Sequence, residues 1–253
     1  MAKDLDQTRS SAAHHPLRRW RERYRDVGLS VILGLQATTM FVIAPLAATG
    51  HWRGEVIEAL RFGLAATAIL IVNRSRLIGV IVGLTFLASL FGAIFVQTGT
   101  AGQAAYLGNI AVTIVFDLAV FLMVARAVFD AGRITVHRIM GAVILYLYVG
   151  LIFASVYRLT VVLLHPSFTG LSSTRQANLG ELLYFSLGAL TTSGSGGILP
   201  LHPFVRSLAN LESVIGQLYP ATFVARLVTL HGSIAGRGGK AEKRGREKEP
   251  DGV

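Results

Sequence analysis

The chain has 253 residues, of which 52% are hydrophobic and only 15% are charged. A typical soluble domain carries about 25% charged residues, so the composition argues against a soluble globular protein. The net charge of +10 does not indicate nucleic-acid binding, because the basic residues lie between and beyond apolar runs. No cysteine is present, which excludes disulfides and thiolate metal sites.

Six apolar runs approach the roughly 20 residues that a helix needs to cross a bilayer. In chain order they are residues 27–48, 56–72, 77–97, 106–129, 139–164 and 205–230. A shorter apolar run, 179–190, lies between the last two and is typical of a re-entrant segment. We therefore expect an all-α membrane protein with six transmembrane helices, the last two flanking a re-entrant helix.

Lys and Arg are distributed asymmetrically between the segments that connect these runs. They are frequent in the N-terminal segment 1–26, in the loops after the second and fourth runs, and in the C-terminal segment 232–253. The loops of the opposite side carry only Arg53 and Arg175. The positive-inside rule then places both termini in the cytoplasm. Anionic lipid is a possible partner of the basic stretch 18–25, although simple compliance with the charge bias is the preferred interpretation.

The most informative segment is a Gly-rich strip that follows the short apolar run. It consists of Thr191, Thr192, Ser193, Gly194, Ser195, Gly196 and Gly197, with Pro200 shortly after. Non-helical backbone at membrane depth is tolerated only where it is buried in protein or lines a cavity. Alternating glycines allow carbonyls to point in one direction, since Gly accepts positive φ. Such carbonyls can replace the hydration shell of a cation.

This segment resembles the pore domain of the potassium-channel superfamily, particularly that of small bacterial six-span proteins. The family filter is commonly T-T-V-G-Y-G-D followed by proline, and Thr191, Thr192, Gly194, Gly196 and Pro200 are in register with it. The resemblance covers 139–231 and implies an outer helix 139–164, a pore helix 179–190, a filter 191–197 and an inner helix 205–230. It also implies a homotetramer in the bacterial inner membrane and monovalent cations bound by the backbone of Thr191, Thr192, Ser193, Gly194 and Ser195.

Several positions depart from the family pattern. Ser193 replaces the usual Val, Ser195 the aromatic residue that braces the filter, and Gly197 the Asp behind it. Gly188 stands where some relatives carry a Glu that pairs with that Asp. We therefore expect weak discrimination between potassium and sodium. The same loss of bracing also permits collapse into a closed filter.

The inner-helix run contains further candidates. Gly216 aligns with the gating-hinge glycine of the family, and Pro220 should bend the helix one turn later. Gln217, Val224 and Val228 are expected to line the pore, since Val224 and Val228 are one helical turn apart.

Charged residues within the apolar runs suggest two pairs. Asp117 is expected to form a structural ion pair with Arg61, with a role in an ion relay as the alternative. Arg158 is expected to brace the inner helix by pairing with Glu212, with a ring of charges in the vestibule as the alternative. The fourth run lacks an Arg repeat, because Arg126 lies at its inner end. We therefore interpret the region 27–130 as a four-helix region that is not a voltage sensor.

The sequence favours a channel over an enzyme. The seven His residues show no metal-binding spacing, and Ser195 lacks the Gly-x-Ser-Gly context of an intramembrane protease. No cofactor is expected beyond the transported ion, potassium or sodium. The second interpretation is a non-conducting scaffold or regulatory subunit with a degenerate pore, and a transporter or intramembrane enzyme is the third. The tail 232–253, rich in Gly and charge, is expected to be disordered.

Overall fold

The computed structural model describes residues 30–43, 45–46, 63, 76–97, 102–129, 136–172 and 179–246. Helices account for 84% of the residues that can be interpreted, which confirms the helical class. The N-terminal segment 1–26 and nearly all of the second apolar run, including Arg61, lie outside the described residues. The two expectations that depend on them, lipid contact by 18–25 and the second span, therefore stay predictions.

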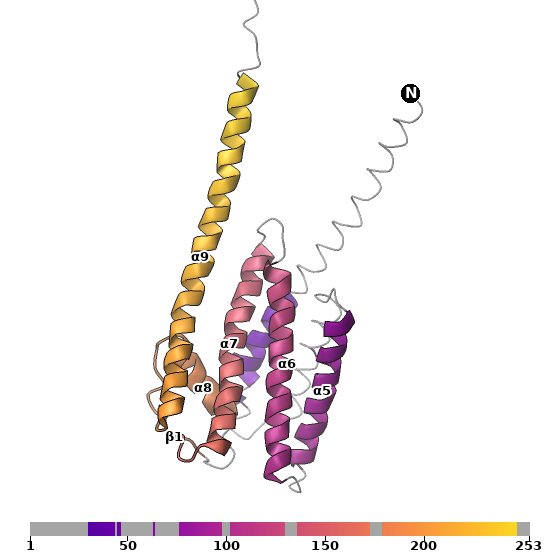
Figure 1. Ribbon diagram of the computed structural model, residues 1–253, viewed down its shortest axis with the longest axis vertical. Helices are drawn as coiled ribbons and strands as arrows, with labels where there is room; N and C mark the ends of the chain where they lie inside the picture. The colour runs from indigo at the N-terminus through magenta and orange to yellow at the C-terminus, as the bar shows by residue number, and fades with distance from the viewer. Residues whose placement is uncertain are drawn as a thin grey trace, which may run out of the picture.

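Three long apolar helices follow a first helical segment, Ser30–Ile43, which ends in a π-helical turn at Thr39–Ile43. They are α5 (Arg76–Gln97), α6 (Gln103–Phe129) and α7 (Val136–Leu163). Helix α6 packs antiparallel to α5, and α7 packs antiparallel to α6 (Figure 1). As a result α5 begins, α6 ends and α7 begins at the same end of the bundle, the end toward which α9 also runs.

The last two helices lie beside α7. The short helix α8 (Leu179–Leu190) has the bounds expected for the re-entrant segment and packs against both α7 and α9. The long helix α9 spans Pro203–Arg246. Two short strands, which the sequence did not predict, pair antiparallel between these helices: β1 (Phe168–Thr169) and β2 (Leu199–Pro200).

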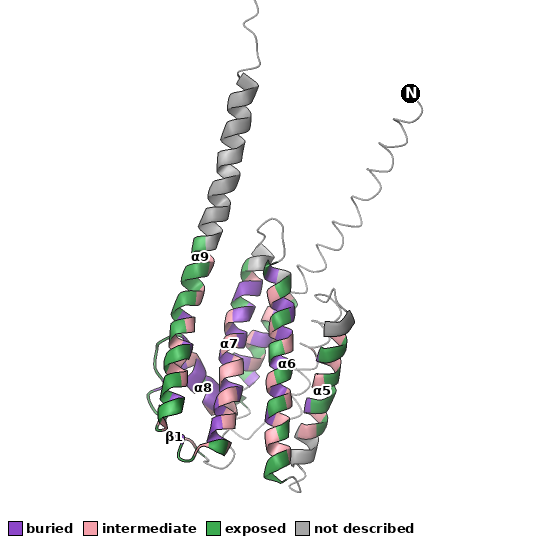
Figure 2. Cartoon of the chain, viewed as in Figure 1, coloured by how far each residue is buried: buried purple, intermediate pink, exposed green. Residues whose placement is uncertain are grey.

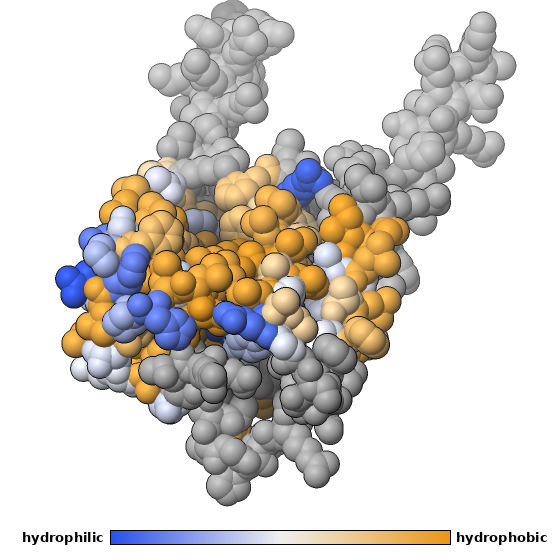
Figure 3. Space-filling model, turned by 60° about the horizontal axis from the view of Figure 1, so that its bottom comes forward, coloured by the Kyte–Doolittle hydropathy of each residue, from blue (hydrophilic) through white to orange (hydrophobic). Residues whose placement is uncertain are grey.

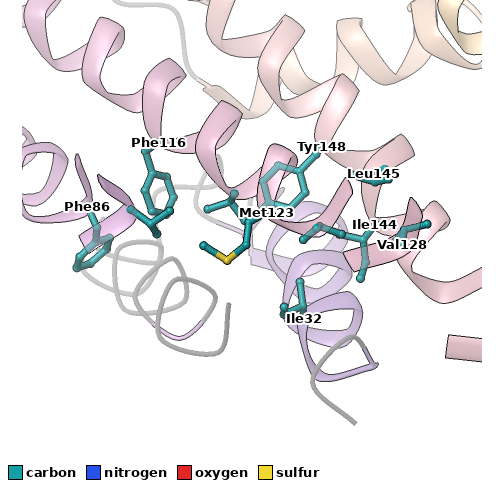
Figure 4. Close-up of a cluster of buried hydrophobic side chains, with 11 residues drawn as sticks. Ile32, Phe86, Phe116, Met123, Val128, Ile144, Leu145 and Tyr148 are labelled. Atoms are coloured by element: carbon teal, nitrogen blue, oxygen red, sulfur yellow. The ribbon is translucent and has the colours of Figure 1, made fainter. Parts of the chain in front are cut away.

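Two clusters of buried apolar side chains hold these elements together. The first joins the segment Ser30–Ile43 to α5, α6 and α7, with Phe86 and Phe116 in ring contact at 5.9 Å (Figure 4). The second joins α7, α8 and the start of α9. Its centre is an aromatic trio, Tyr157, Phe168 and Phe185, whose rings meet edge-to-face at 5.0–5.7 Å. Edge-to-face pairs add stability beyond the area that they bury, so the position of α8 on α7 is well defined.

The outer surface of the bundle is apolar. Large hydrophobic side chains are exposed along α5, α6 and α9 (Figures 2 and 3), for example Phe91 on α5 and Leu218 on α9. Two of the helices, at Gln103–Arg126 and Ile139–Leu163, are long and apolar enough to cross a membrane. These two coincide with the fourth and fifth expected spans.

The helix α9 is longer than expected. It continues to Arg246, so residues 232–246 are helical and the prediction of a disordered tail is wrong for them. Extending an existing helix adds one hydrogen bond for each residue fixed, whereas starting a helix is unfavourable. The stretch 240–244, Lys-Ala-Glu-Lys-Arg, consists of good helix formers, whereas the five glycines of 232–246 disfavour the helix.

Candidate functional site

The strip between α8 and β2 has an unusual backbone. Positive φ recurs at every second residue, with 57° at Thr192, 80° at Gly194 and 35° at Gly196. Thr192 is the only non-glycine residue with positive φ in the part of the chain that the structure describes. For a residue branched at Cβ this conformation is strained and is found mainly at functional sites. The alternation expected from the glycines is therefore present, and it begins at Thr192, two residues before the first glycine of the strip.

The strip is tied to the last turn of α8. The amide of Thr192 donates to the carbonyl of Ala189 at 3.1 Å, and that of Gly194 donates to Gly188 at 3.1 Å. Gly188 has no side chain in the way, since a Cβ there would lie 2.9 Å from the carbonyl oxygen of Gly194. These bonds satisfy carbonyls that a helix end leaves without partners. The C-terminal end of α8 therefore holds the strip.

Helix α9 holds the same turn from the other side. Ser213 donates to the carbonyl of Ala189 at 2.8 Å, and Tyr146 of α7 donates to that of Leu190 at 3.2 Å. A Cβ on Gly216 would lie only 1.8 Å from the Leu190 carbonyl oxygen. Gly216, expected as a hinge, thus lies at the closest contact between α9 and α8.

The predicted pore residue Gln217 reaches the strip. Its amide nitrogen Nε2 donates to the hydroxyl of Thr192 at 2.9 Å, and that hydroxyl donates to the carbonyl of Thr191 at 2.7 Å. The hydroxyls of Thr191 and Ser193 lie 2.9 Å apart. Residues 191–193 and Gln217 are exposed in the single chain. The structure therefore gathers their polar groups on one open face.

The far half of the strip forms a tight turn. The hydroxyl of Ser195 donates to the carbonyl of Ile198 at 2.9 Å, and the Ser195 carbonyl accepts the amides of Gly197 and of Ile198. Ser195 is buried in this turn. Ser and Gly are typical turn residues, because Ser bonds local backbone groups and Gly adopts unusual φ.

This turn changes the expected ion site. The five carbonyls from Thr191 to Ser195 are not all free to bind an ion in this conformation. Those of Thr191 and Ser195 accept bonds within the chain, and that of Gly194 packs against Gly188. The carbonyls of Thr192 and Ser193 remain without a bond from the residues that the structure describes.

The turn is anchored beyond Ile198. Phe168 pairs with Pro200 and Thr169 with Leu199 in the two-stranded sheet, and Leu201 donates to the carbonyl of Ser167 at 2.8 Å. The strip is therefore fixed at both ends, by α8 at one end and by the segment after α7 at the other.

The expected pairing of Arg158 with Glu212 is wrong. Glu212 is completely buried and is hydrogen-bonded to Tyr157 and Ser186. The Arg158 guanidinium instead donates to the hydroxyl of Tyr106 on α6 at 3.1 Å and lies 5.4 Å from the centre of its ring. Neighbouring residues of a helix point about 100° apart, so Tyr157 faces α8 and α9 while Arg158 faces α6.

For the other predicted residues, the structure describes only some of the side chains and partners. Asp117 is buried and accepts a bond from Ser155 at 3.4 Å, whereas its expected partner Arg61 is not among the described residues. Pro220 lies inside α9, and Val224 is exposed on it. Val228 belongs to α9, but its side chain lies outside the described part. The described residues contain no group of three or more His, Asp or Glu that could hold a metal ion.

Sequence reasoning missed three residues of this region, Ser186, Tyr157 and Ser213. Each is a hydroxyl residue on a helix face that packs against another helix. Ser186 and Tyr157 lie in helices that are mostly apolar, which is a signal that the sequence carries.

Comparisons of the chain with models of known protein families, with curated proteins and with solved structures found no match.

Proposed function

We propose that the chain is the subunit of a homotetrameric cation channel in the bacterial inner membrane, with weak potassium selectivity and no voltage sensor. The observation that supports this proposal most directly is the strip 191–197. Its positive φ values alternate, its polar groups form an open face, and a short helix and a long helix hold it in place. One such strip cannot surround an ion, so the site requires several copies.

The membrane setting supports the same proposal. Of the two apolar helices that could cross a bilayer, α7 packs against α8 and α9, which hold the strip, and α6 packs against α7. In an apolar medium a non-helical segment with free carbonyls is tolerated only where it is buried in protein or lines a water-filled cavity, and the carbonyls here lie on an exposed face of the chain. The carbonyls of Thr192 and Ser193 and the hydroxyls beside them are the groups available to a partly hydrated cation.

Weak selectivity follows from the turn at Ser195. A strip that can close a turn on its own carbonyl is not held at one diameter, so the energy gap between ions of different size falls. A change of ~1.4 kcal/mol is already tenfold in relative binding, and one buried hydrogen bond is worth about that much. The bracing residues of the potassium-channel family would oppose this turn.

The deciding experiment measures reversal potentials in liposomes under potassium–sodium gradients. The variants are the native chain and the double variant Ser195→Tyr with Gly197→Asp. A Cβ at position 197 would meet no atom within 4 Å, so an Asp has room there. We expect a small potassium preference in the native chain and a larger one in the double variant. Strong potassium selectivity of the native chain would contradict the proposal that the strip is loose because Ser195 and Gly197 replace the bracing residues of the family.

One observation favours a second function, a non-conducting scaffold or regulatory subunit. The turn withdraws the Ser195 and Gly194 carbonyls from the open face. If the native chain carries no current and the double variant does, the second function replaces the first.

A further inference from the structure

A buried carboxyl group lies where α7, α8 and α9 meet. The hydroxyl of Tyr157 donates to Glu212 Oε2 at 2.7 Å. Glu212 Oε1 and Ser186 Oγ form a hydrogen bond, and Ser186 Oγ also lies 2.7 Å from the carbonyl oxygen of Gly150. Glu212, Tyr157 and Ser186 are each at most 1% exposed. Solvent therefore supplies none of the protons in this network.

The number of hydrogen atoms in this network defines its protonation state. A serine hydroxyl has one hydrogen, and a backbone carbonyl can only accept. If Ser186 donates to Gly150, the contact between Ser186 and Glu212 needs a second hydrogen. If Ser186 donates to Glu212 instead, the oxygens of Ser186 and Gly150 face each other at 2.7 Å with no hydrogen between them. Only a hydrogen on Glu212 Oε1 satisfies both contacts, and it leaves Oε2 free to accept from Tyr157.

The charges around the carboxyl group agree with this assignment. The hydrogen bonds of the Glu212 carboxyl are formed with the hydroxyls of Tyr157 on α7 and Ser186 on α8, neither of which carries positive charge. The Arg158 guanidinium is bound to Tyr106 on α6 instead. A buried carboxylate without a cationic partner is strongly disfavoured.

We propose that Glu212 is a neutral carboxylic acid that donates its proton to Ser186 and thereby positions α8 between α7 and α9. Ser186 lies two residues before Gly188, whose carbonyl binds the amide of Gly194. Glu212 is therefore a positioning residue for the strip 191–197, and its meaning for ion passage rests on the proposed function. The protonation state itself does not.

Infrared difference spectroscopy of the purified full chain in lipid nanodiscs tests the protonation state. The spectrum of Glu212→Gln is subtracted from that of the native chain at neutral pH. We expect a carboxylic-acid C=O band in the native chain that is lost in Glu212→Gln and kept in Glu181→Gln, which changes the acid in the first turn of α8. A lost carboxylate band in place of the acid band would overturn the proposal, whether or not the chain conducts.

Variants test the positioning role. A glutamine can donate its amide hydrogen to Ser186 and accept from Tyr157, so Glu212→Gln should keep the native amide exchange of Gly194. Ser186→Ala removes the link, and peptides covering 191–197 should exchange roughly tenfold faster.

The two variants also separate this inference from the proposed function. If Glu212 were an ionised acceptor of two hydrogen bonds, Glu212→Gln would be as harmful as Ser186→Ala, and equal acceleration by both would contradict the proposal. Both measurements are made without current, so a chain that does not conduct gives the same readouts.

Discussion

At the scale of single residues, close backbone contact explains more of this site than side-chain chemistry does. Gly216 and Gly188 are both in helices, where glycine costs stability relative to alanine. Each lies where a Cβ would meet a backbone oxygen within 3 Å. Their absence of a side chain lets α9 approach α8 and lets α8 approach the strip.

Gly216→Ala should therefore destabilise the protein. The new Cβ would lie 1.8 Å from the Leu190 carbonyl oxygen, which belongs to backbone and cannot rotate away. Forcing extra volume into a packed contact costs about 1–3 kcal/mol. Thermal unfolding in detergent, followed by circular dichroism, should show a clear loss. Gly83→Ala on α5 is the control, because its Cβ would meet no atom within 4 Å, and we expect a gain of about 0.5–1 kcal/mol. Equal behaviour of the two variants would contradict the role given to Gly216.

At the scale of elements, α8 is a short helix whose C-terminal carbonyls all serve as anchors. The carbonyls of residues 187–190 accept bonds from the strip, from α9 and from α7. A free C-terminal end would carry partial negative charge toward the open face. In this structure the bonds from Ser213 and Tyr146 reduce that charge and fix the direction in which the chain leaves α8.

Ser213→Ala should loosen this end of α8. The lost bond to the Ala189 carbonyl is only partly buried, so we expect a loss of about 1 kcal/mol in the free energy of unfolding. Thr222→Ala is the matched control, since the Thr222 hydroxyl bonds only carbonyls of its own helix, those of Leu218 and Tyr219. Its effect should stay within about 0.5 kcal/mol. Chemical unfolding in mixed micelles measures both, and a Thr222→Ala loss as large as that of Ser213→Ala would show that the contact between helices is not what matters.

The bounds of the elements could be predicted from the sequence more fully than their local hydrogen bonds could. The length of the apolar run 179–190 was enough to predict the bounds of α8, because an apolar helix of that length between polar segments has few alternatives. The turn at Ser195 was not predictable from the same pattern. The turn forms because the Ser195 hydroxyl bonds the Ile198 carbonyl and the Gly197 amide bonds the Ser195 carbonyl, which would otherwise be available to the open face. The spacing of apolar residues gives no information on such local hydrogen bonds. The pairing of Arg158 with Glu212 was wrong because opposite charge alone does not determine which face of a helix a residue occupies.

At the scale of the whole molecule, the single chain leaves one side of α8 and α9 uncovered. Apolar side chains that are more than half exposed lie there, namely Tyr184, Leu211, Val214 and Leu218. Three of them recur on α9 at spacings of three and four residues, which places them on one face of the helix. In the proposed tetramer this face packs against the neighbouring subunit.

Leu218→Trp should therefore lower the fraction of tetramer. A larger side chain does not fit a packed interface between helices, whereas lipid chains adapt to it. Leu87→Trp on α5 is the control, because Leu87 is 60% exposed and Leu218 is 58% exposed in the single chain. Native mass spectrometry from nanodiscs should show tetramer in the native chain and in Leu87→Trp but a reduced amount in Leu218→Trp. A stable monomer or dimer of the native chain would refute the tetramer itself.

Helix α9 is long enough that a small change of tilt at its base would move its far end by a large distance. Its 44 residues extend about 66 Å at 1.5 Å per residue, roughly twice the hydrocarbon thickness of a bilayer. Pro220 cannot donate a hydrogen bond to the Gly216 carbonyl, so the helix is weakest near the contact with α8. From Pro220 to Arg246 the arm is about 39 Å long, and a tilt of about 10° at its base displaces the far end by about 7 Å. A small rotation beside the strip would thus become a displacement of several ångströms at the far end of the arm.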